Sequence, residues 1–222
     1  MMPMTPRPAW AVVELLIGIA IIVLGLAGYI AFSSTPWLLL AATIFIWRRG
    51  PGWREVGLRR LDNPSAVVTA SLAAGVAYQF LGLYAVEPAI AQLTHAGLPD
   101  VSAFRPLIGN GSLLAFWLAI SWTMAAFMEE LVYRGWFLTR IAELGGFSRG
   151  AWLASAIGSS ALFGAAHLYQ GPSGMLATGL TGAFFAAVYL VTGRNLWGCI
   201  LAHGTLDTAG FVLIYLGLYP GL

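Results

Sequence analysis

Five acidic or histidine side chains lie well inside the apolar segments of this 222-residue chain: Glu129, Glu130, His167, His203 and Asp207. The two glutamates directly follow seventeen residues, Ser112 to Met128, that carry no charge. On insertion scales a charged side chain in a bilayer costs about 2.5–3.5 kcal/mol, so an ionisable residue there is by itself a functional hypothesis. Carboxylates and imidazoles in such surroundings relay protons, exchange protons with a reacting water or bind metal ions.

The composition indicates that these segments are membrane spans. Of all residues 59% are hydrophobic and only 9% are charged, against roughly 25% charged in a soluble domain. The length suits about six to eight spans with short loops. We therefore expect an all-α fold, a polytopic integral membrane helical bundle with about seven transmembrane helices. The single cysteine, Cys199, lies in an apolar segment and builds no disulfide framework.

Seven apolar stretches define the expected spans, and polar or Gly- and Pro-rich stretches separate them. A cleaved signal peptide is an alternative for the first stretch, but its apolar core exceeds the ~7–15 residues of such a signal, so we expect a retained helix. Glu14 lies within about a turn of the start of this helix, so its side chain should reach the membrane interface. The expected spans are residues 10–32, 37–47, 64–86, 113–142, 151–169, 175–192 and 196–217. The expected organisation is a cytoplasmic tail (1–9), N-terminal transmembrane helices (10–111) with a basic cytoplasmic loop (48–63) and an outer loop (87–111), a catalytic core (112–217) and a C-terminal tail (218–222).

The positive charges predict the orientation. All 11 Lys and Arg residues are arginines, and seven spans with a cytoplasmic N-terminus place every one except Arg105 on the cytoplasmic side. This pattern predicts a multi-pass protein of the plasma or inner membrane whose partner is the lipid bilayer. The net charge of +2 does not indicate a nucleic-acid partner, because the arginines lie in short loops as topology signals.

The spacing predicts that the polar groups meet. The spans on either side of Gly145-Gly146 should form an antiparallel hairpin with Glu129 and Phe163 at one height and His167 one turn, ~6 Å, beyond. His203, nine residues past Arg194, should lie at a similar depth. We expect one cavity in the cytoplasmic half of the bundle, open to the cytoplasm.

Helical periodicity separates the roles of the two glutamates. Glu130 and Arg134 are four residues apart and share a face, which predicts an ion pair that neutralises one charge. Glu129 points about 100° away from Glu130 and is left to project into the bundle. His203 and Asp207 have the same four-residue spacing and form a polar stripe on the last span.

Three motifs in this order resemble the signature of the CAAX-protease and bacteriocin-processing (CPBP, Abi) family of intramembrane endopeptidases. They are Glu129-Glu130-x-x-x-Arg134, Phe163-x-x-x-His167 and His203-x-x-x-Asp207, within residues 112–217. The resemblance implies hydrolysis of peptide bonds in membrane-associated peptides or proteins. It implies Glu129 as the general base with His167, and His203 and Asp207 as stabilisers of the oxyanion. Glu130, Arg134 and Phe163 would support the site. The family carries Asn or Asp at its last motif position, and this chain has Asp207.

Several alternatives stay open beside this interpretation. The glutamate mechanism needs no cofactor, whereas Glu129, His167 and His203 could also be zinc ligands of a metalloprotease with an open fourth position. The absence of a His-Glu-x-x-His motif favours the metal-free form. A transporter would use the same groups as a proton relay, and an immunity scaffold would not need their chemistry. The compact, all-arginine chain is typical of a bacterial protein. The substrate is expected to be a peptide or membrane protein, and the sequence leaves the oligomeric state open.

Overall fold

The computed structural model describes residues 6–50, 52–220 and 222, and the first five residues of the expected tail lie outside this part. The described chain is helical and contains no strand, which confirms the expected helical membrane bundle. Within the described residues, five helices are long and apolar enough to cross a membrane: 8–26, 64–94, 111–144, 168–191 and 196–215. The expected second and fifth spans correspond to α2 (Thr35–Arg49) and α7 (Arg149–Ala166), which are not among these five.

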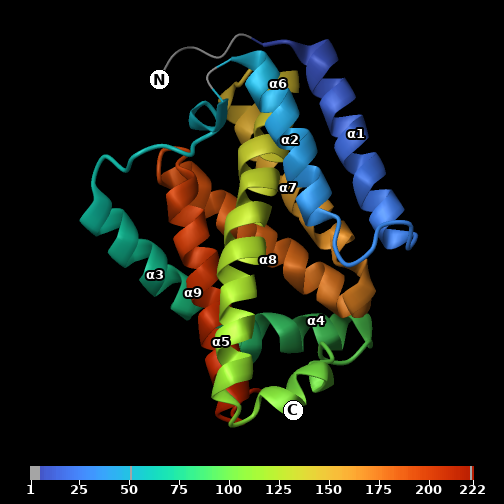
Figure 1. The fold of residues 1–222 in the computed structure, drawn as a ribbon, viewed down its shortest axis with the longest axis vertical. Coiled ribbons are helices and arrows are strands. Elements are labelled where there is room, and N and C mark those ends of the chain that lie inside the picture. Colours follow the sequence, from blue (N-terminus) through green and yellow to red (C-terminus); the bar gives the residue numbers. More distant parts are fainter. Residues whose placement is uncertain (1–5, 51, 221) are drawn as a thin grey trace.

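The helices run between two ends of an elongated molecule (Figure 1). One end carries the start of α1 (Pro8–Leu26), the C-terminal end of α2 and the starts of α7 and α9 (Leu196–Tyr215). We call it the arginine end, because Arg48, Arg49, Arg149 and Arg194 lie there. The opposite end carries α4 (Glu87–Thr94), the short helix η3 (Ser102–Leu107) and the C-terminus, and we call it the α4 end.

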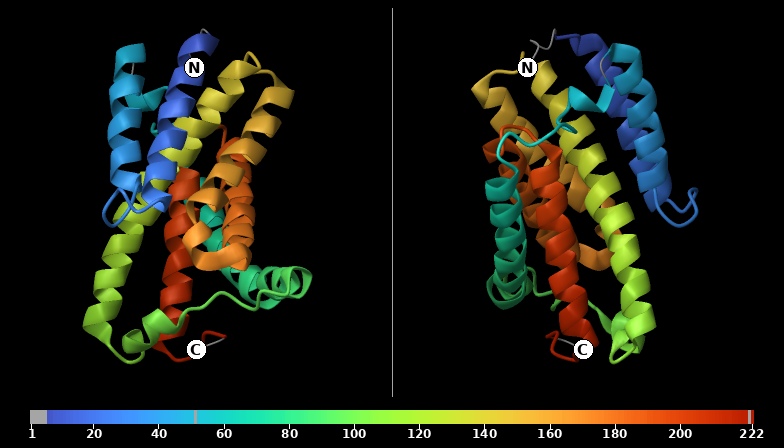
Figure 2. Two further views of the ribbon diagram at one scale, coloured as in Figure 1. Left: turned by 90° about the vertical axis from the view of Figure 1, so that its right-hand side faces the viewer. Right: turned by 60° about the vertical axis from the view of Figure 1, so that its left-hand side comes forward.

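One interrupted helical rod, residues 111–144, connects the two ends (Figure 2). It consists of α5 (Gly111–Ile120), the π-helical segments η4 (Ser121–Glu129) and η5 (Leu131–Phe137), and α6 (Leu138–Leu144). Wide π-helical turns inside α-helices are rare and occur frequently at functional sites. Here they contain Glu129 and surround Glu130, the residues that the sequence singled out.

The helix ends differ from the expected ones in two places. The first helix spans Pro8–Leu26 rather than 10–32, because Gly28 takes a left-handed conformation (φ 79°) that ends it. The expected outer loop 87–111 begins as helix instead: α3 (Pro64–Leu81) continues through the π-helical turn η2 (Gly82–Val86) into α4. Pro88 is the second residue of α4 and directly follows the π-helical turn, and its ring removes one backbone N–H from the continuous helix.

Close helix contacts at small residues hold the last part of the bundle together. The remaining long helix, α8 (Gly171–Val191), packs along α7, and α3 packs along α9. A Cβ atom on Gly75 would collide with the carbonyl oxygen of Ala202, and one on Gly164 would lie 2.7 Å from the carbonyl oxygen of Met175. Small residues let helix backbones approach closely in membranes, where van der Waals packing drives association. The first contact fixes α9 next to His203.

A buried ionic network lies near the arginine end. Glu14 was expected to reach the membrane interface, but it is only 1% exposed and accepts hydrogen bonds from Arg49 and, at 2.7 Å, from Trp136 Nε1. Glu143 binds NH1 of Arg49 at 2.8 Å and NH1 of Arg140 at 2.7 Å. Two carboxylates and two guanidinium groups therefore neutralise each other and join α1, α2 and α6.

Candidate active site

Glu130 connects the interrupted helical rod (residues 111–144) to α9. Its Oε1 atom accepts a hydrogen bond from NH1 of Arg134 at 2.9 Å, so the structure contains the expected ion pair. The same oxygen lies 2.8 Å from Nδ1 of His203, a contact that spacing along one helix did not predict. Glu130 and Arg134 are both 0% exposed. Because a carboxylate only accepts, Nδ1 of His203 is the donor in this contact.

Aromatic rings enclose this charged pair. The guanidinium carbon of Arg134 lies 4.6 Å from the ring centre of Phe163 and 5.1 Å from that of Phe185. Phe185 also stacks on His203, with ring centres 4.4 Å apart. Arg134 additionally donates to the carbonyl oxygen of Gly182 at 2.9 Å. The cation–π contacts and hydrogen bonds replace water around the buried cation and hold the His203 ring in one orientation.

His167 lies at the end of α7 rather than inside it. The helix ends at Ala166, and Nδ1 of His167 lies 2.8 Å from the backbone carbonyl oxygen of Phe163. A carbonyl oxygen can only accept, so Nδ1 carries the hydrogen, and Nε2 of the neutral ring is an acceptor. The local backbone thus selects the tautomer of this histidine.

Glu129 and Asp207 complete the set of expected site residues. Glu129 is half-buried, and its Oε1 accepts a hydrogen bond from Oγ1 of Thr35 at 3.5 Å. Oδ2 of Asp207 accepts a hydrogen bond from Oγ of Ser121 at 2.6 Å and lies 3.6 Å from Nε2 of His203. The expected His203–Asp207 stripe is therefore present, with Ser121 as an additional partner.

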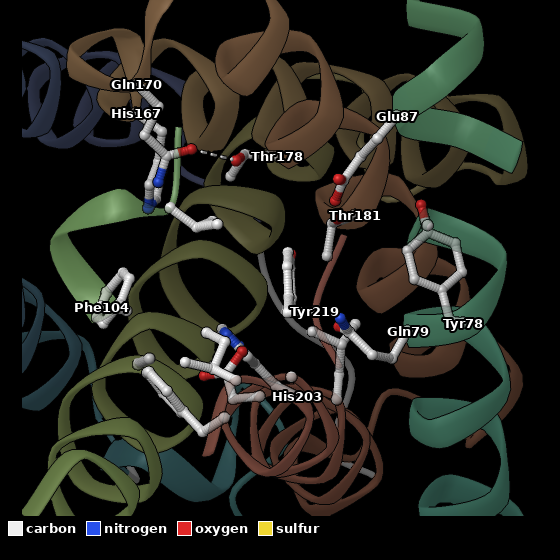
Figure 3. Close-up of a pocket in the computed structure, with 18 of the residues that line it drawn as sticks. Tyr78, Gln79, Glu87, Phe104, His167, Gln170, Thr178, Thr181, His203 and Tyr219 are labelled. Carbon is white, nitrogen blue, oxygen red and sulfur yellow. Dashed lines mark hydrogen bonds and ion pairs between the residues drawn. The ribbon is translucent and has the colours of Figure 1, made fainter. Parts of the chain in front are cut away.

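All four expected catalytic residues line one cavity of about 420 Å³ (Figure 3). This volume falls in the ~300–1,000 Å³ range of ligand pockets. Phe163 also lines the cavity, whereas Glu130 and Arg134 lie in the packed layer behind His203 and do not. The structure thus brings Glu129, His167, His203 and Asp207 together in the wall of one cavity. The charged side chains of Glu130 and Arg134 are not part of this wall.

Several polar residues around the site were not anticipated. Ser121 and Thr35 bind the two carboxylates directly, and Tyr78, Gln79, Glu87 and Tyr219 line the part of the cavity away from His167 (Figure 3). Gln79 and Ser121 are polar residues in otherwise apolar stretches, and that signal could have drawn attention to them. Glu87 was assigned to a loop, so its place in the cavity wall depended on the unexpected helix α4.

The cavity extends in an unexpected direction. We expected the N-terminus and the opening on the same, cytoplasmic side. However, the wall runs from His203 along α9 to Ile214 and Tyr219, and it includes Val101 and Phe104 near η3, so it reaches toward the α4 end. The N-terminus lies at the arginine end. The cytoplasmic location of the N-terminus and of the opening stays a prediction.

The donor atoms of the two histidines bear on the zinc alternative. Both histidines engage Nδ1, with Phe163 and with Glu130, which leaves Nε2 as the free nitrogen and would also suit a zinc-bound imidazole. However, within residues 6–50, 52–220 and 222 no three His, Cys, Asp or Glu side chains are arranged to hold one metal ion. Glu129, His167 and His203 therefore do not converge on one point in this arrangement of the side chains.

The fold and the site define a polytopic membrane protein with a carboxylate–histidine centre inside its helical bundle. Residues 111–209 match the family model described as type II CAAX prenyl endopeptidase, Rce1-like. This match over residues 111–209 is consistent with the CAAX-protease family of membrane peptidases, which the three motifs of the sequence resemble. Comparison with curated proteins and with solved structures gave no significant match.

Proposed function

We propose that this protein is an intramembrane endopeptidase in which Glu129 and His167 activate a water molecule for attack on a peptide carbonyl. The observation that carries the proposal is that Glu129 shares one cavity with a histidine whose tautomer is set. Because Phe163 accepts the hydrogen of Nδ1, Nε2 of His167 can accept a proton or hold the water. Both residues line the same cavity.

The proposed reaction begins with removal of a proton from this water by Glu129. The resulting hydroxide attacks the carbonyl carbon, and the carbonyl oxygen becomes the oxyanion of a tetrahedral intermediate. Collapse of the intermediate breaks the C–N bond, and the proton held by Glu129 or His167 passes to the leaving nitrogen. Preorganised donors that face the oxyanion usually contribute the largest part of such catalysis.

His203 and Asp207 are the proposed oxyanion donors. Glu130 occupies Nδ1 of His203, so only Nε2 is left for the substrate oxygen, and it donates when the ring is an imidazolium. Asp207 donates when it carries a proton. Its Oδ2 already accepts from Ser121, so the other oxygen is the one available to the substrate.

A proton-relay transporter is the competing function, and the burial pattern argues against it. A transporter needs a polar path to both faces. Here Phe185, Tyr189 and Leu196, each at most 1% exposed, pack in the core cluster between His203 and the start of α9. This closed layer suits a one-sided cavity.

The test is cleavage of a library of membrane-associated peptides by the purified protein in detergent. We expect Glu129→Gln to reduce cleavage at least ~100-fold, the lower range of general acid–base contributions. The matched control is Glu55→Gln, the same exchange in the connector between α2 and α3, and it should cleave like the wild type. Equal cleavage by the Glu129→Gln variant and the wild type would overturn the proposal.

A further inference from the structure

One carboxylate in the cavity wall has no counter-ion. Glu87, the first residue of α4, is half-buried, and its carboxyl group points into the cavity (Figure 3). Within the described residues it forms neither an ion pair nor a hydrogen bond. The carboxylates of Glu129 and Asp207, in contrast, each accept a hydrogen bond from a neighbouring hydroxyl group. Because a buried carboxylate is costly unless it is paired, the unpaired one indicates a place for an incoming cation.

The register between α3 and α9 places Glu87 far from the proposed catalytic residues. Both helices run toward the α4 end (Figure 2), and a Cβ atom on Gly210 would lie 3.3 Å from Nε2 of Gln79. Glu87 follows Gln79 by about 12 Å of helix, and Gly210 follows Asp207 by about 4.5 Å. Glu87 and Asp207 are therefore roughly 16 Å apart along the bundle, at opposite ends of one cavity.

Two tyrosines and an amide surround this end of the cavity. Tyr219 interacts with both Glu87 and Gln79, and all three line the wall. Tyr78, another lining residue, stacks on Phe184 with ring centres 4.1 Å apart, which holds its ring in place. A carboxylate next to aromatic rings suits an ammonium or guanidinium group, because the carboxylate pairs with the charge and the rings attract it electrostatically.

The charges of the whole cavity favour the same ligand. Its wall contains the carboxylates of Glu87, Glu129 and Asp207 but no arginine of the described chain, and lysine is absent from the sequence. A cavity lined by one sign of charge raises the local concentration of groups of the opposite sign. Glu87 lies outside residues 111–209, so the family match assigns it no role.

We propose that Glu87, together with Tyr78 and Tyr219, forms a subsite for a basic side chain of the substrate. The ligand is a lysine or arginine about five residues from the scissile bond, because an extended chain advances about 3.3 Å per residue. This inference rests on the proposed peptidase function. The basic side chain supplies the counter-ion that Glu87 lacks, and it fixes the register of the peptide against the catalytic residues.

The subsite is tested by binding, which needs no cleavage. Glu129→Gln protein, inactive in the proposed mechanism, is immobilised in detergent and incubated with a library of membrane-associated peptides, and the bound peptides are sequenced. We expect peptides with a lysine or arginine to be enriched at least ~10-fold over matched peptides with norleucine. The double variant Glu129→Gln/Glu87→Gln should lose this enrichment, and Glu129→Gln/Glu87→Lys should enrich acidic peptides instead.

The matched control is Glu129→Gln/Asp100→Asn, which removes an exposed acid in the loop between α4 and η3, outside the cavity wall. It should keep the enrichment of basic peptides. Glu87→Gln is nearly isosteric, and unfolding in detergent verifies that the variants are folded. Equal enrichment with and without the Glu87 carboxylate would overturn the subsite.

Cleavage tests the distance between the subsite and the catalytic residues. A peptide that the wild type cleaves is synthesised with a single lysine at successive positions from the scissile bond. We expect a lysine about five residues away to lower KM with little change in kcat, and Glu87→Gln to remove this effect. A KM independent of the position of the lysine would overturn the proposal. Glu87-dependent binding of basic peptides without cleavage of any peptide would instead refute the peptidase function, while the cation subsite stands.

Discussion

Oε1 of Glu130 lies 2.8 Å from Nδ1 of His203, although the two residues are 73 positions apart in the chain. The same oxygen holds Arg134, so one buried atom connects the ion pair of the central rod with the histidine of α9. Glu130 therefore does more than neutralise a charge. It fixes which nitrogen of His203 faces the cavity, and the layer that closes the cavity is also the layer that orients this histidine.

This shared contact predicts different effects on stability and activity. Arg134→Met leaves a buried carboxylate without its cation and should lower the free energy of unfolding by about 3–5 kcal/mol. The double variant Glu130→Leu/Arg134→Met replaces the pair with apolar side chains and should regain most of that loss. It should nevertheless cleave peptides poorly, because His203 loses its partner. Unfolding in detergent measures the predicted stabilities, and peptide cleavage measures the predicted activities. Full activity of the double variant would show that Glu130 only neutralises Arg134 and does not position His203.

Asp207 predicts a pH effect through the hydrogen it must donate. Wild-type cleavage should fall as the pH rises, because a deprotonated carboxylate cannot donate to the oxyanion. Asp207→Asn carries an N–H donor at every pH, so its cleavage rate should stay flat over the range where the wild type declines. Asp207→Leu, which has no donor, should be slow throughout. Parallel decline of the wild type and Asp207→Asn would assign the pH effect to another group.

The ionic network near the arginine end should affect stability alone. Glu14→Gln leaves Arg49 and Arg140 with only Glu143 between them, and we expect a loss of about 3–5 kcal/mol in unfolding free energy. None of these residues lines the cavity, so cleavage per folded molecule should not change. Glu55→Gln is again the control for the exchange itself. If Glu14→Gln unfolds with the same free energy as the wild type, water molecules compensate Arg49 and Arg140 for the lost carboxylate.

The close approach of α3 and α9 gives a packing prediction. Gly75→Ala forces a Cβ atom against the carbonyl oxygen of Ala202, beside His203, and overpacking of this kind costs about 1–3 kcal/mol. Both stability and cleavage should fall. Gly150→Ala is the matched control, because a Cβ there meets nothing within 4 Å. If the two variants unfold alike, the contact at Gly75 is not as tight as the structure has it.

The helices and the proximity of the motif residues could be predicted from the sequence, because both depend on local patterns in the chain. Apolar runs of span length specify helices in a membrane, and the Gly145-Gly146 break specifies the hairpin that brings α6 and α7 together. The Glu130–Arg134 and His203–Asp207 contacts follow from four-residue spacing within one helix.

The contacts between helices could not be predicted in the same way. Spacing along α9 does not say which residue of another helix will face His203, so the Glu130 contact was missed. Pro88 was taken as part of a loop, because a proline ends a helix as often as it begins one, and the direction of the cavity depended on α4. Glu14 was assigned to the membrane interface, because its partners Arg49, Trp136 and Arg140 lie on other helices.

The most direct test of the central claim, that Glu129 activates water without a metal, is cleavage after exhaustive chelation. Wild type and Glu129→Gln are treated with a strong chelator, assayed on one cleaved peptide, and assayed again after zinc is added back. We expect the wild-type rate to be unchanged by chelation and the variant to stay inactive with and without zinc. Loss of wild-type cleavage on chelation, with recovery on addition of zinc, would contradict the claim and place Glu129, His167 and His203 around a metal ion.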